Sequence, residues 1–581
     1  MVGLQFGVAY HKKLEMISII LLLSCVLNIY GIDWGLPSQE RTNLVFPEAR
    51  ENGELFKFLK EGGKKDLLDS PESYGYQYER SKKNWEFPPN RFPHDKPMQS
   101  LLRNYLLTTS SEREYSVIAG ISSMDPGHLN FNPHFFHYGG CFIYTVGMVL
   151  KVASWLDLIR LAPDRISYFN HPDNLRKVYI VGRLVVVFSV TISCLLLYFL
   201  GKSLYGKEAG LFAALAFGIS PGVVASAHIM NPYLFGVCFI LLFLICLLKV
   251  KERGSRAWYI LSGLSLGLAV GSVVYLVIFL IHFLTCHLLR SVGGGIKGYL
   301  HSLKDSNLLF ALGSMLLAFF FTNPYYLISF KEVLYEKTYD LSLYSFSLSL
   351  ENLNRFTFTF FWTTHGLFLS ILILLGLFYS LARGRELWFL PLLPIVYFLI
   401  ASAIIGKGSP RSFRFALSLI PFTSFLAGIA AHNLWVLQRK WIKVFIGLVF
   451  TITIFYSLLY SFNFKQDTSE NSTFLKAGKW INQNVPKESS IGLMHLFTPS
   501  TTPPFDFRRF RIIVYTSGRL CSEKRYFSQY VVSTERIDDL LVPYYQLIQS
   551  FSPSWPLSTL GFVDHFAEAN RPVFIYKKSI S

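Results

Sequence analysis

Residues 178–207 read VYIVGRLVVVFSVTISCLLLYFLGKSLYGK, and this stretch decides the class of the protein. The apolar run Val178–Leu200 is long enough to cross a bilayer as an α-helix, which needs about 20 such residues. A short loop with two cations, Lys202 and Lys207, follows directly. Because short loops rich in Lys and Arg stay on the cytoplasmic side, the stretch predicts both a membrane span and its orientation.

The rest of the chain repeats this pattern. Of its 581 residues, 51% are apolar and 16% are charged, whereas a soluble domain carries about 25% charged residues. Eleven stretches approach spanning length. They are Leu14–Tyr30, Val178–Leu200, Ala209–Ser226, Leu234–Leu248, Tyr259–Gly271, Ser272–Leu289, Leu308–Phe321, Gly366–Leu381, Leu387–Ile404, Phe415–Ala431 and Val444–Ser461. The sequence therefore predicts a polytopic α-helical membrane protein with about 11 spans.

The cations of the short loops predict how these spans are oriented. With the N-terminus inside, five short loops rich in Lys and Arg all lie on the inner side. The apolar segment Cys141–Trp155 contains Lys151, and a crossing there would invert the bias. We therefore expect it to form an interfacial or juxtamembrane helix at the outer surface, with the C-terminus also outside.

Three larger regions then lie outside the membrane: residues 31–177, 322–365 and 462–581. The first is far longer than an ordinary connection, and such loops are usually functional. The last is polar enough for a small α/β domain. It contains an amphipathic helix over Phe474–Val485 and short strands at Ser490–Leu493, Ile512–Tyr515 and Val573–Tyr576. We expect a transmembrane module over 1–461 and an extracytoplasmic domain over 462–581.

Charge and cysteine content exclude other classes. The net charge of +18 fits inner loops beside anionic lipid, so no nucleic-acid partner is expected. None of the seven Cys lies in a CxxC motif or a Cys/His cluster, so no such metal site is predicted.

Three carboxylates follow the first span closely: Asp33, Glu40 and Glu48. An acid near the membrane surface and Trp34 is partly desolvated, which raises its pKa and suits it to proton abstraction. Alternatively, these acids have no catalytic function and belong to the solvated start of a loop, with Trp34 as an aromatic belt residue at the membrane surface.

The outer loop at 406–414 reads GKGSPRSFR and carries Lys407, Arg411 and Arg414, against the bias of the inner loops. Arg presents a planar fork that matches phosphate oxygens, so this exception indicates an anion site. The alternative is a tolerated local charge, because the orientation rule is statistical.

Other polar residues lie near the same side. His134 and His137 lie in an aromatic stretch that suits a sugar ring and equally an interface belt. Arg183 is an intramembrane cation, which either marks a site or snorkels to the head groups. His228 and Asn231 add polar edges, although a capped helix break explains them as well.

At these residues the chain resembles the GT-C membrane glycosyltransferases. It is most similar to bacterial members of the dolichyl-phosphate-mannose protein mannosyltransferase group, with the lipid A aminoarabinose transferase more distant. The motifs are Trp34-Gly35-Leu36-Pro37, Asn132-Pro133-His134-Phe135-Phe136-His137-Tyr138, Gly182-Arg183-Leu184, Leu204-Tyr205-Gly206, Asn323-Pro324-Tyr325, Arg414-Phe415 with Pro421, Lys476-Ala477-Gly478 and Trp480-Ile481.

The resemblance implies transfer of a sugar from a polyprenyl-phosphate donor at the outer face, usually with inversion. It implies an acidic base in the first outer loop, for which Phe46-Pro47-Glu48-Ala49 is the nearest match. The base is then Glu48, with Glu40 and Asp33 as fallbacks, and Arg414 and Arg411 would hold the lipid phosphate. The acceptor is a lipid, glycan or protein, and the expected location is a bacterial inner membrane with a periplasmic site.

The sequence also departs from the family. Phe46 replaces the usual His, Ala49 replaces a second acid, and Asn231 stands where many relatives carry an acid. The loss of these carboxylates weakens the case for metal assistance, so a divalent metal stays open and no cofactor is certain. Two alternatives remain: a lipid-linked saccharide flippase or transporter, and an inactive relative that only binds a lipid phosphate. The clustering of charge at the outer rim, without an internal repeat, favours the enzyme.

Overall fold

The computed structural model describes residues 2–47, 85–87, 96–162, 165–169, 171–290, 304–342, 350–383, 389–404, 416–494, 498–515, 528–537, 544–554 and 569–579. The chain divides into two compact units. The helical unit comprises Met1–Tyr30, Asn132–Val149 and Arg183–Ser461, and the sheet unit comprises Gly31–Phe131, Leu150–Gly182 and Phe462–Ser581.

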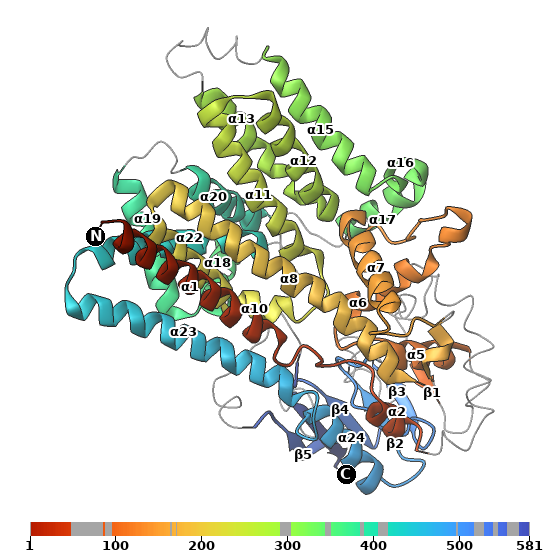
Figure 1. Ribbon diagram of the computed structural model, residues 1–581. Coiled ribbons are helices and arrows are strands. Elements are labelled where there is room, and N and C mark those ends of the chain that lie inside the picture. Colours follow the sequence, from red (N-terminus) through yellow and green to blue (C-terminus); the bar gives the residue numbers. More distant parts are fainter. Residues whose placement is uncertain are drawn as a thin grey trace. The chain divides into compact units, whose positions relative to one another are not determined.

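Helices, most of them apolar, build the helical unit (Figure 1). In chain order they are α1 (Val2–Ile29), α7 (Gly140–Trp155), α8 (Pro172–Tyr205), α9 (Lys207–Gly218), α10 (Pro221–Ala227), α11 (Pro232–Arg253), α12 (Arg256–Ser272), η3 (Val274–Phe279), α13 (Leu280–Leu289), α15 (Ser306–Thr322), α16 (Tyr325–Ile328), α17 (Phe330–Ser342), α18 (Leu350–His365), α19 (Leu367–Arg383), α20 (Phe389–Ile404), η5 (Leu417–Leu419), α22 (Ile420–Val436) and α23 (Lys440–Gln466). Helix α12 packs against α11 and α15, and α22 packs against α9 and α19. Helices α7, α8 and α23 contribute residues to both units.

Four of the described helical segments are long and apolar enough to cross a membrane: α8, α11, Leu417–Val436 and α23. The bent pair α9–α10 makes a fifth if it counts as one span. Shorter apolar helices cover Met16–Ile29, Gly140–Trp155, Val274–Leu289, Ser306–Thr322 and Leu367–Ala382. The predicted class, mostly helical with a small C-terminal sheet, is confirmed, while the count of eleven spans stays a prediction.

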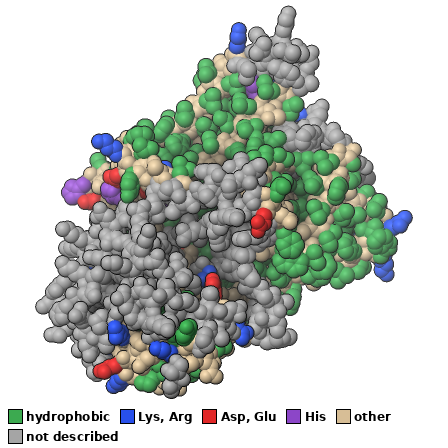
Figure 2. Space-filling model, turned by 180° about the vertical axis from the view of Figure 1, so that it is seen from behind, with side chains coloured by type: hydrophobic (Ala, Val, Ile, Leu, Met, Phe, Trp, Pro, Cys, Tyr) green, Lys and Arg blue, Asp and Glu red, His purple; other side chains and the backbone are tan. Residues whose placement is uncertain are grey.

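Large apolar side chains cover much of the described surface of this unit. Figure 2 shows broad continuous areas of them, and Leu317, Phe378 and Phe455 are among the exposed residues. Soluble monomers rarely expose apolar patches of this extent. The exposed apolar surface therefore fits contact with lipid.

The predicted span Ala209–Ser226 consists of two helices in the structure. Helix α9 ends at Gly218, α10 begins at Pro221, and the two helices are bent by 53°. Proline lacks the backbone N–H that would continue the ladder, and its ring clashes with the preceding turn. At the first position of a new helix neither effect costs anything, so the break falls there.

The predicted split near Gly271 is confirmed, because α12 ends at Ser272 and the 3-10 helix η3 begins at Val274. The glycines at four-residue spacing face α15. A Cβ atom built on Gly263 would lie 2.1 Å from the Ala311 carbonyl oxygen, and one on Gly267 would lie 2.3 Å from that of Met315. Small residues allow this close helix approach.

The sheet unit combines short helices with a six-stranded sheet. Its elements are α2 (Gln39–Val45), β1 (Trp85–Phe87), α5 (Lys96–Leu107), α6 (Glu112–Ser123), η1 (Pro126–His128), η2 (Arg165–Phe169), α24 (Thr473–Asn484), β2 (Ser490–Leu493), β3 (Arg511–Val514), β4 (Tyr530–Ser533), β5 (Tyr545–Phe551) and β6 (Val573–Lys578). The predicted helix and three predicted strands are therefore confirmed within one or two residues.

The strand order is β1-β3-β2-β4-β6-β5. Strands β3, β2 and β4 are parallel to one another, whereas β1, β6 and β5 each pair antiparallel. Strand β1 comes from the region predicted as the first outer loop, and its Phe87 pairs with Ile512. The sheet thus joins two stretches that lie far apart in the sequence.

Candidate functional site

A cavity of about 210 Å³, lined by both charged and apolar residues, lies in the sheet unit. Its walls come from six separate stretches: residues 33–41, 105–110, the start of α8, the segment 467–475 after α23, residues 499–504 and Asn570. Four carboxylates line it, those of Asp33, Glu40, Asp173 and Asp467. Two of the sequence-predicted acids, Asp33 and Glu40, therefore share one cavity.

A tight turn places Asp33 at the cavity. Gly31 and Gly35 have φ angles of 88° and 60°, which only glycine adopts readily, and they bracket the turn. The ring of Trp34 is fully buried and lies 5.1 Å from that of Phe464. The turn between Gly31 and Gly35 is thus anchored by Trp34, and it places Asp33 at the cavity.

Two cations contact the Asp33 carboxylate. Arg176 of α8 forms an ion pair with it, and the Lys465 ammonium lies 3.6 Å from its second oxygen. The Asp33 side chain is only 17% exposed. The Asp33 carboxylate thus links the turn after the first helix to cations from α8 and α23.

Glu40 lies in the first turn of α2, where a negative charge interacts favourably with the helix dipole. Ser38 caps this helix by accepting the backbone N–H of Arg41 at 3.2 Å. A Glu40 oxygen lies 2.9 Å from the ammonium of Lys479, and the two side chains are 40% and 41% exposed. Glu40 is thus the more accessible of the two predicted acids.

Arg41 lines the cavity and holds its wall together through hydrogen bonds. Its guanidinium donates to the carbonyl oxygens of Leu106 and Thr108, at 3.1 and 2.7 Å. It also lies over the ring of Tyr105, 5.7 Å from the centroid. Burial lowers the pKa of Arg41 and raises that of the Tyr105 hydroxyl, because both charged forms lose water.

Glu48, Lys407, Arg411 and Arg414 lie outside the described residues, so their roles stay predictions. The chain just before Glu48 is fixed, however. The Phe46 side chain is buried, and the Arg508 guanidinium lies 5.5 Å from its ring centroid. The Phe46 backbone N–H caps α2 by donating to the Thr42 carbonyl at 2.8 Å.

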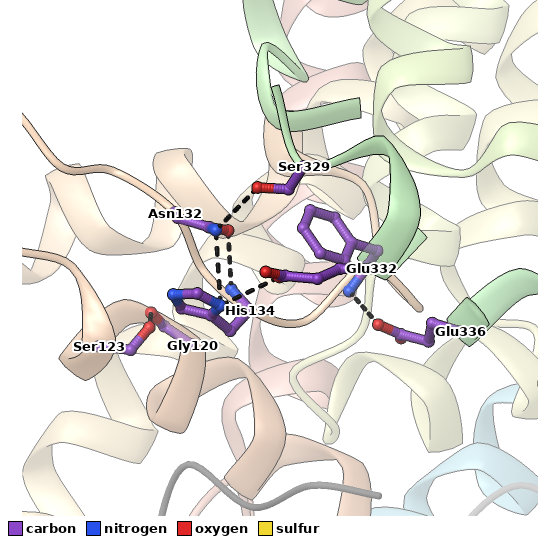
Figure 3. Close-up of polar contacts among 8 residues, drawn as sticks. Gly120, Ser123, Asn132, His134, Ser329, Glu332 and Glu336 are labelled. Atoms are coloured by element: carbon purple, nitrogen blue, oxygen red, sulfur yellow. Dashed lines mark hydrogen bonds and ion pairs between the residues drawn. The ribbon is translucent and has the colours of Figure 1, made fainter. Parts of the chain in front are cut away.

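His134 belongs to the helical unit and contacts α17 (Figure 3). Its Nδ1 lies 3.1 Å from a Glu332 oxygen. Asn132 accepts the backbone N–H of His134 at 3.1 Å and donates to the Ser329 hydroxyl at 3.1 Å. His137 is half-buried beside the ring of Tyr138. The structure therefore places His134 in a polar contact with α17.

The two glycines after this segment sit in a helix junction. The Gly139 N–H donates to the Ser272 carbonyl at 3.0 Å, and the Gly140 N–H donates to Asn323 at 2.7 Å. Asn323 in turn donates to the Gly271 carbonyl at 3.1 Å. Two motifs that the resemblance singled out, residues 132–138 and 323–325, are thus joined in space.

The remaining predicted residues of the helical unit are buried. Both ring nitrogens of His228 face carbonyl oxygens, those of Val224 at 2.7 Å and Tyr30 at 3.0 Å. Asn231 caps α11 by accepting the Tyr233 N–H at 3.2 Å, which matches the helix-break interpretation. Arg183 is fully buried in α8.

Sequence reasoning missed Asp173, Arg176 and Asp467 at the cavity. Asp173 and Arg176 open α8 one turn apart, and Asp467 directly follows α23. Charged residues at helix ends are common, so no local signal distinguishes these three. As to metals, the residues that the structure describes contain no group of three or more His, Cys, Asp or Glu side chains that could hold an ion.

A comparison with known protein families finds one match. Residues 175–326, from α8 to α16, match the family described as dolichyl-phosphate-mannose-protein mannosyltransferase. No curated protein matches the chain. The matched segment includes Arg176, Arg183, Asn231 and Asn323.

Solved structures give further similarities. The structure of ArnT from Cupriavidus metallidurans bound to undecaprenyl phosphate is 12% identical, with 84% of this chain and 83% of that chain covered at a TM-score of 0.45. AglB from Archaeoglobus fulgidus, in complex with an inhibitory peptide and a dolichol-phosphate, is 12% identical, with 83% and 62% covered at 0.42. The same organism's oligosaccharyltransferase in complex with Zn and sulfate is 14% identical, with 61% and 51% covered at 0.37. The chain thus spans between about half and two thirds of the archaeal enzyme's length.

Proposed function

We propose that this chain, which resembles the GT-C membrane glycosyltransferases, transfers a sugar from a polyprenyl-phosphate carrier to an acceptor hydroxyl. The family match over residues 175–326 supports the reaction class. The single structural observation that carries the proposal is the cavity shared by Asp33 and Glu40, directly after the first apolar helix. Carboxylates around a cavity accept hydrogen bonds from hydroxyl groups, as sugar recognition requires.

In the proposed reaction, Glu48 takes the proton of the acceptor hydroxyl. The acceptor oxygen then attacks the anomeric carbon of the sugar, and the bond from that carbon to the phosphate oxygen breaks. The electron pair leaves with the polyprenyl phosphate, and the configuration at the anomeric carbon inverts. Arg411 and Arg414, assisted by Lys407, offset the charge that develops on the leaving phosphate.

The described residues take supporting roles in this proposal. Asp33 and Arg176 hold the turn after the first helix against the start of α8. Glu40 offers a half-exposed carboxylate to a hydroxylated ligand in the cavity. The buried Phe46 sets the position from which the chain continues to Glu48.

The proposed location of the reaction is the outer face of a bacterial inner membrane. The cations of the five short inner loops support this orientation. The acceptor is then a lipid, a glycan or a protein at that face.

The test uses the purified full-length chain with candidate polyprenyl-phosphate sugars and mass spectrometry of the released sugar or product. Turnover with one carrier supports the proposal. Glu48→Gln is expected to lower kcat by about 10²–10⁴-fold, the usual contribution of a general base. Glu252→Gln, at an exposed end of α11, is the matched control and should keep full activity. A folded Glu48→Gln variant with full activity would rule out that base.

Transport of a labelled lipid-linked sugar across a bilayer, without bond cleavage, would overturn the transferase proposal. Tight carrier binding without turnover for any sugar would instead indicate an inactive relative.

A further inference from the structure

Helix α17 exposes a stripe of apolar side chains, while two of its glutamates contact the segment Asn132–Tyr138. The helical repeat places Phe330, Leu334 and Leu341 along one stripe, with Glu332 and Glu336 on the opposite side. Phe330 is 59% exposed and Leu334 is 54% exposed. A helix on a water-facing surface has the reverse arrangement, with its apolar stripe against the core.

The acidic side of α17 holds the segment Asn132–Tyr138, as Figure 3 shows for part of it. A Glu336 oxygen accepts the backbone N–H of Phe136 at 2.7 Å. The Lys337 ammonium donates to the Phe136 carbonyl at 2.6 Å, and His134 contacts Glu332 at 3.1 Å. Three charged side chains of α17 thus contact protein groups, and the stripe of Phe330, Leu334 and Leu341 is exposed.

The exposed stripe continues into the neighbouring helices. Leu327 and Ile328 of α16 are exposed, Ile328 to 72%. The apolar helix α15 precedes α16 directly and exposes Leu317 and Phe321. Helix α15 belongs to the apolar bundle, and α16 and α17 follow it in the chain with the same kind of exposed apolar side chains.

We propose that α16 and α17 form a lipid-contact surface at the head-group boundary of the bilayer, and that this contact holds the segment Asn132–Tyr138 in place. The occupant is phospholipid, whose acyl chains cover Ile328, Phe330 and Leu334. Lys331 flanks the stripe and is exposed, as suits a side chain that reaches anionic head groups. The proposal does not depend on the transferase activity, since neither test below measures sugar transfer.

The first test places the photocrosslinking residue p-benzoylphenylalanine at Leu334 in the full-length chain, reconstituted with phosphatidylethanolamine and phosphatidylglycerol. Ile328 serves as a second position should the first variant fail to fold. Mass spectrometry then measures covalent lipid. Leu317 on α15 is the positive control, and Ile548, an exposed residue of strand β5, is the control for a sheet surface. We expect adducts at 334 or 328 to exceed those at 548 by about tenfold.

The second test asks whether lipid contact holds the bound segment. Leu334→Asp should speed amide hydrogen exchange at Phe136 by about tenfold, because a carboxylate draws α17 away from hydrocarbon. Ile548→Asp makes the same kind of substitution at an exposed position of strand β5 and should leave the exchange rate unchanged.

Three outcomes would overturn the proposal. The first is absence of lipid adducts at 334 and 328 while 317 is labelled. The second is crosslinking of these positions to a protein or to a second copy of the chain. The third is equal exchange at Phe136 in both aspartate variants.

Discussion

The side-chain oxygen of Asn323 accepts a hydrogen bond from the backbone N–H of Gly140 at 2.7 Å. The same amide group donates to the carbonyl of Gly271 at 3.1 Å. A Cβ atom on Gly140 would lie 2.2 Å from the Thr322 carbonyl oxygen, so no larger residue fits at this position unless the backbone moves. Asn323 therefore connects the start of α7, the end of α12 and the end of α15 through hydrogen bonds.

Replacing this asparagine should destabilise the helical unit. Asn323→Ala leaves a buried N–H and a buried carbonyl without these partners, at a cost of about 1–3 kcal/mol each. Thermal unfolding in detergent, followed by intrinsic fluorescence, measures the loss. Asn433→Ala is the control, because Asn433 donates only within its own helix, to Ile429. Equal shifts for both variants would contradict the special role of Asn323.

The close contact between α12 and α15 gives a second prediction. Gly267→Ala places a methyl group 2.3 Å from the Met315 carbonyl oxygen, and overpacking of this kind costs about 1–3 kcal/mol. Gly313→Ala on α15 meets nothing within 4 Å and should be neutral or slightly stabilising, by at most about 1 kcal/mol. The unfolding temperatures of the two variants, measured side by side, test this prediction. A stable Gly267→Ala variant would show that the helices are not so close.

The ion pair between Asp33 and Arg176 should couple the two residues energetically. Both side chains are partly buried, so a double-mutant cycle of Asp33→Asn and Arg176→Ala should give a coupling energy of about 1 kcal/mol. Chemical denaturation of the four proteins provides the measurement. Strict additivity would mean that the pair does not persist in solution.

Glu40 allows chemistry to be separated from stability. Its ion pair with Lys479 is about 40% exposed on each side, and such pairs contribute at most about 1 kcal/mol. Glu40→Gln should therefore fold normally, while its KM for a sugar donor or acceptor rises if the cavity binds hydroxyl groups. Lys479→Ala removes the same ion pair but keeps the carboxylate, so it is the matched control. An unchanged KM in Glu40→Gln would remove this residue from the binding site.

The proposed base and the proposed phosphate clamp must act on the same side of the membrane. Single cysteines at positions 48 and 411, introduced after replacement of the native cysteines, should both react with an impermeant reagent added outside. Intact vesicles with a known orientation provide the assay. Labelling of the two positions from opposite compartments would rule out the proposed transferase mechanism.

Local sequence patterns predicted the helices and strands whose surroundings are reflected in their own residues. Apolar runs predicted α8, α11 and α23, because a helix in hydrocarbon must be apolar along its length. Alternation and turn signals likewise predicted β2, β3 and β6. Strands β1, β4 and β5 were missed, although the short strand β4 is buried along its whole length. Strand β1 has three residues, and β5 carries polar residues on its exposed face, so neither gives a strong pattern.

The site was predictable only in part for a similar reason. Proximity to the first span pointed to Asp33 and Glu40, and both line the cavity. Nothing local to Arg176 or Asp467 shows that α8 and α23 bring them to the same place, because that convergence depends on tertiary packing. The helix-break interpretation of Asn231 needed only a neighbouring proline, and the structure agrees with it.

Strand β1 also has a consequence for biosynthesis. The ribosome makes Trp85–Phe87 early, whereas the partner residues Ile512–Val514 emerge only after the last apolar helix has been made. Non-local pairing of this kind is slow, since the intervening chain must first be ordered. We therefore expect Trp85–Phe87 to remain unpaired, and accessible to chaperones, until translation is nearly complete. A nascent chain arrested before residue 511 would keep that edge open.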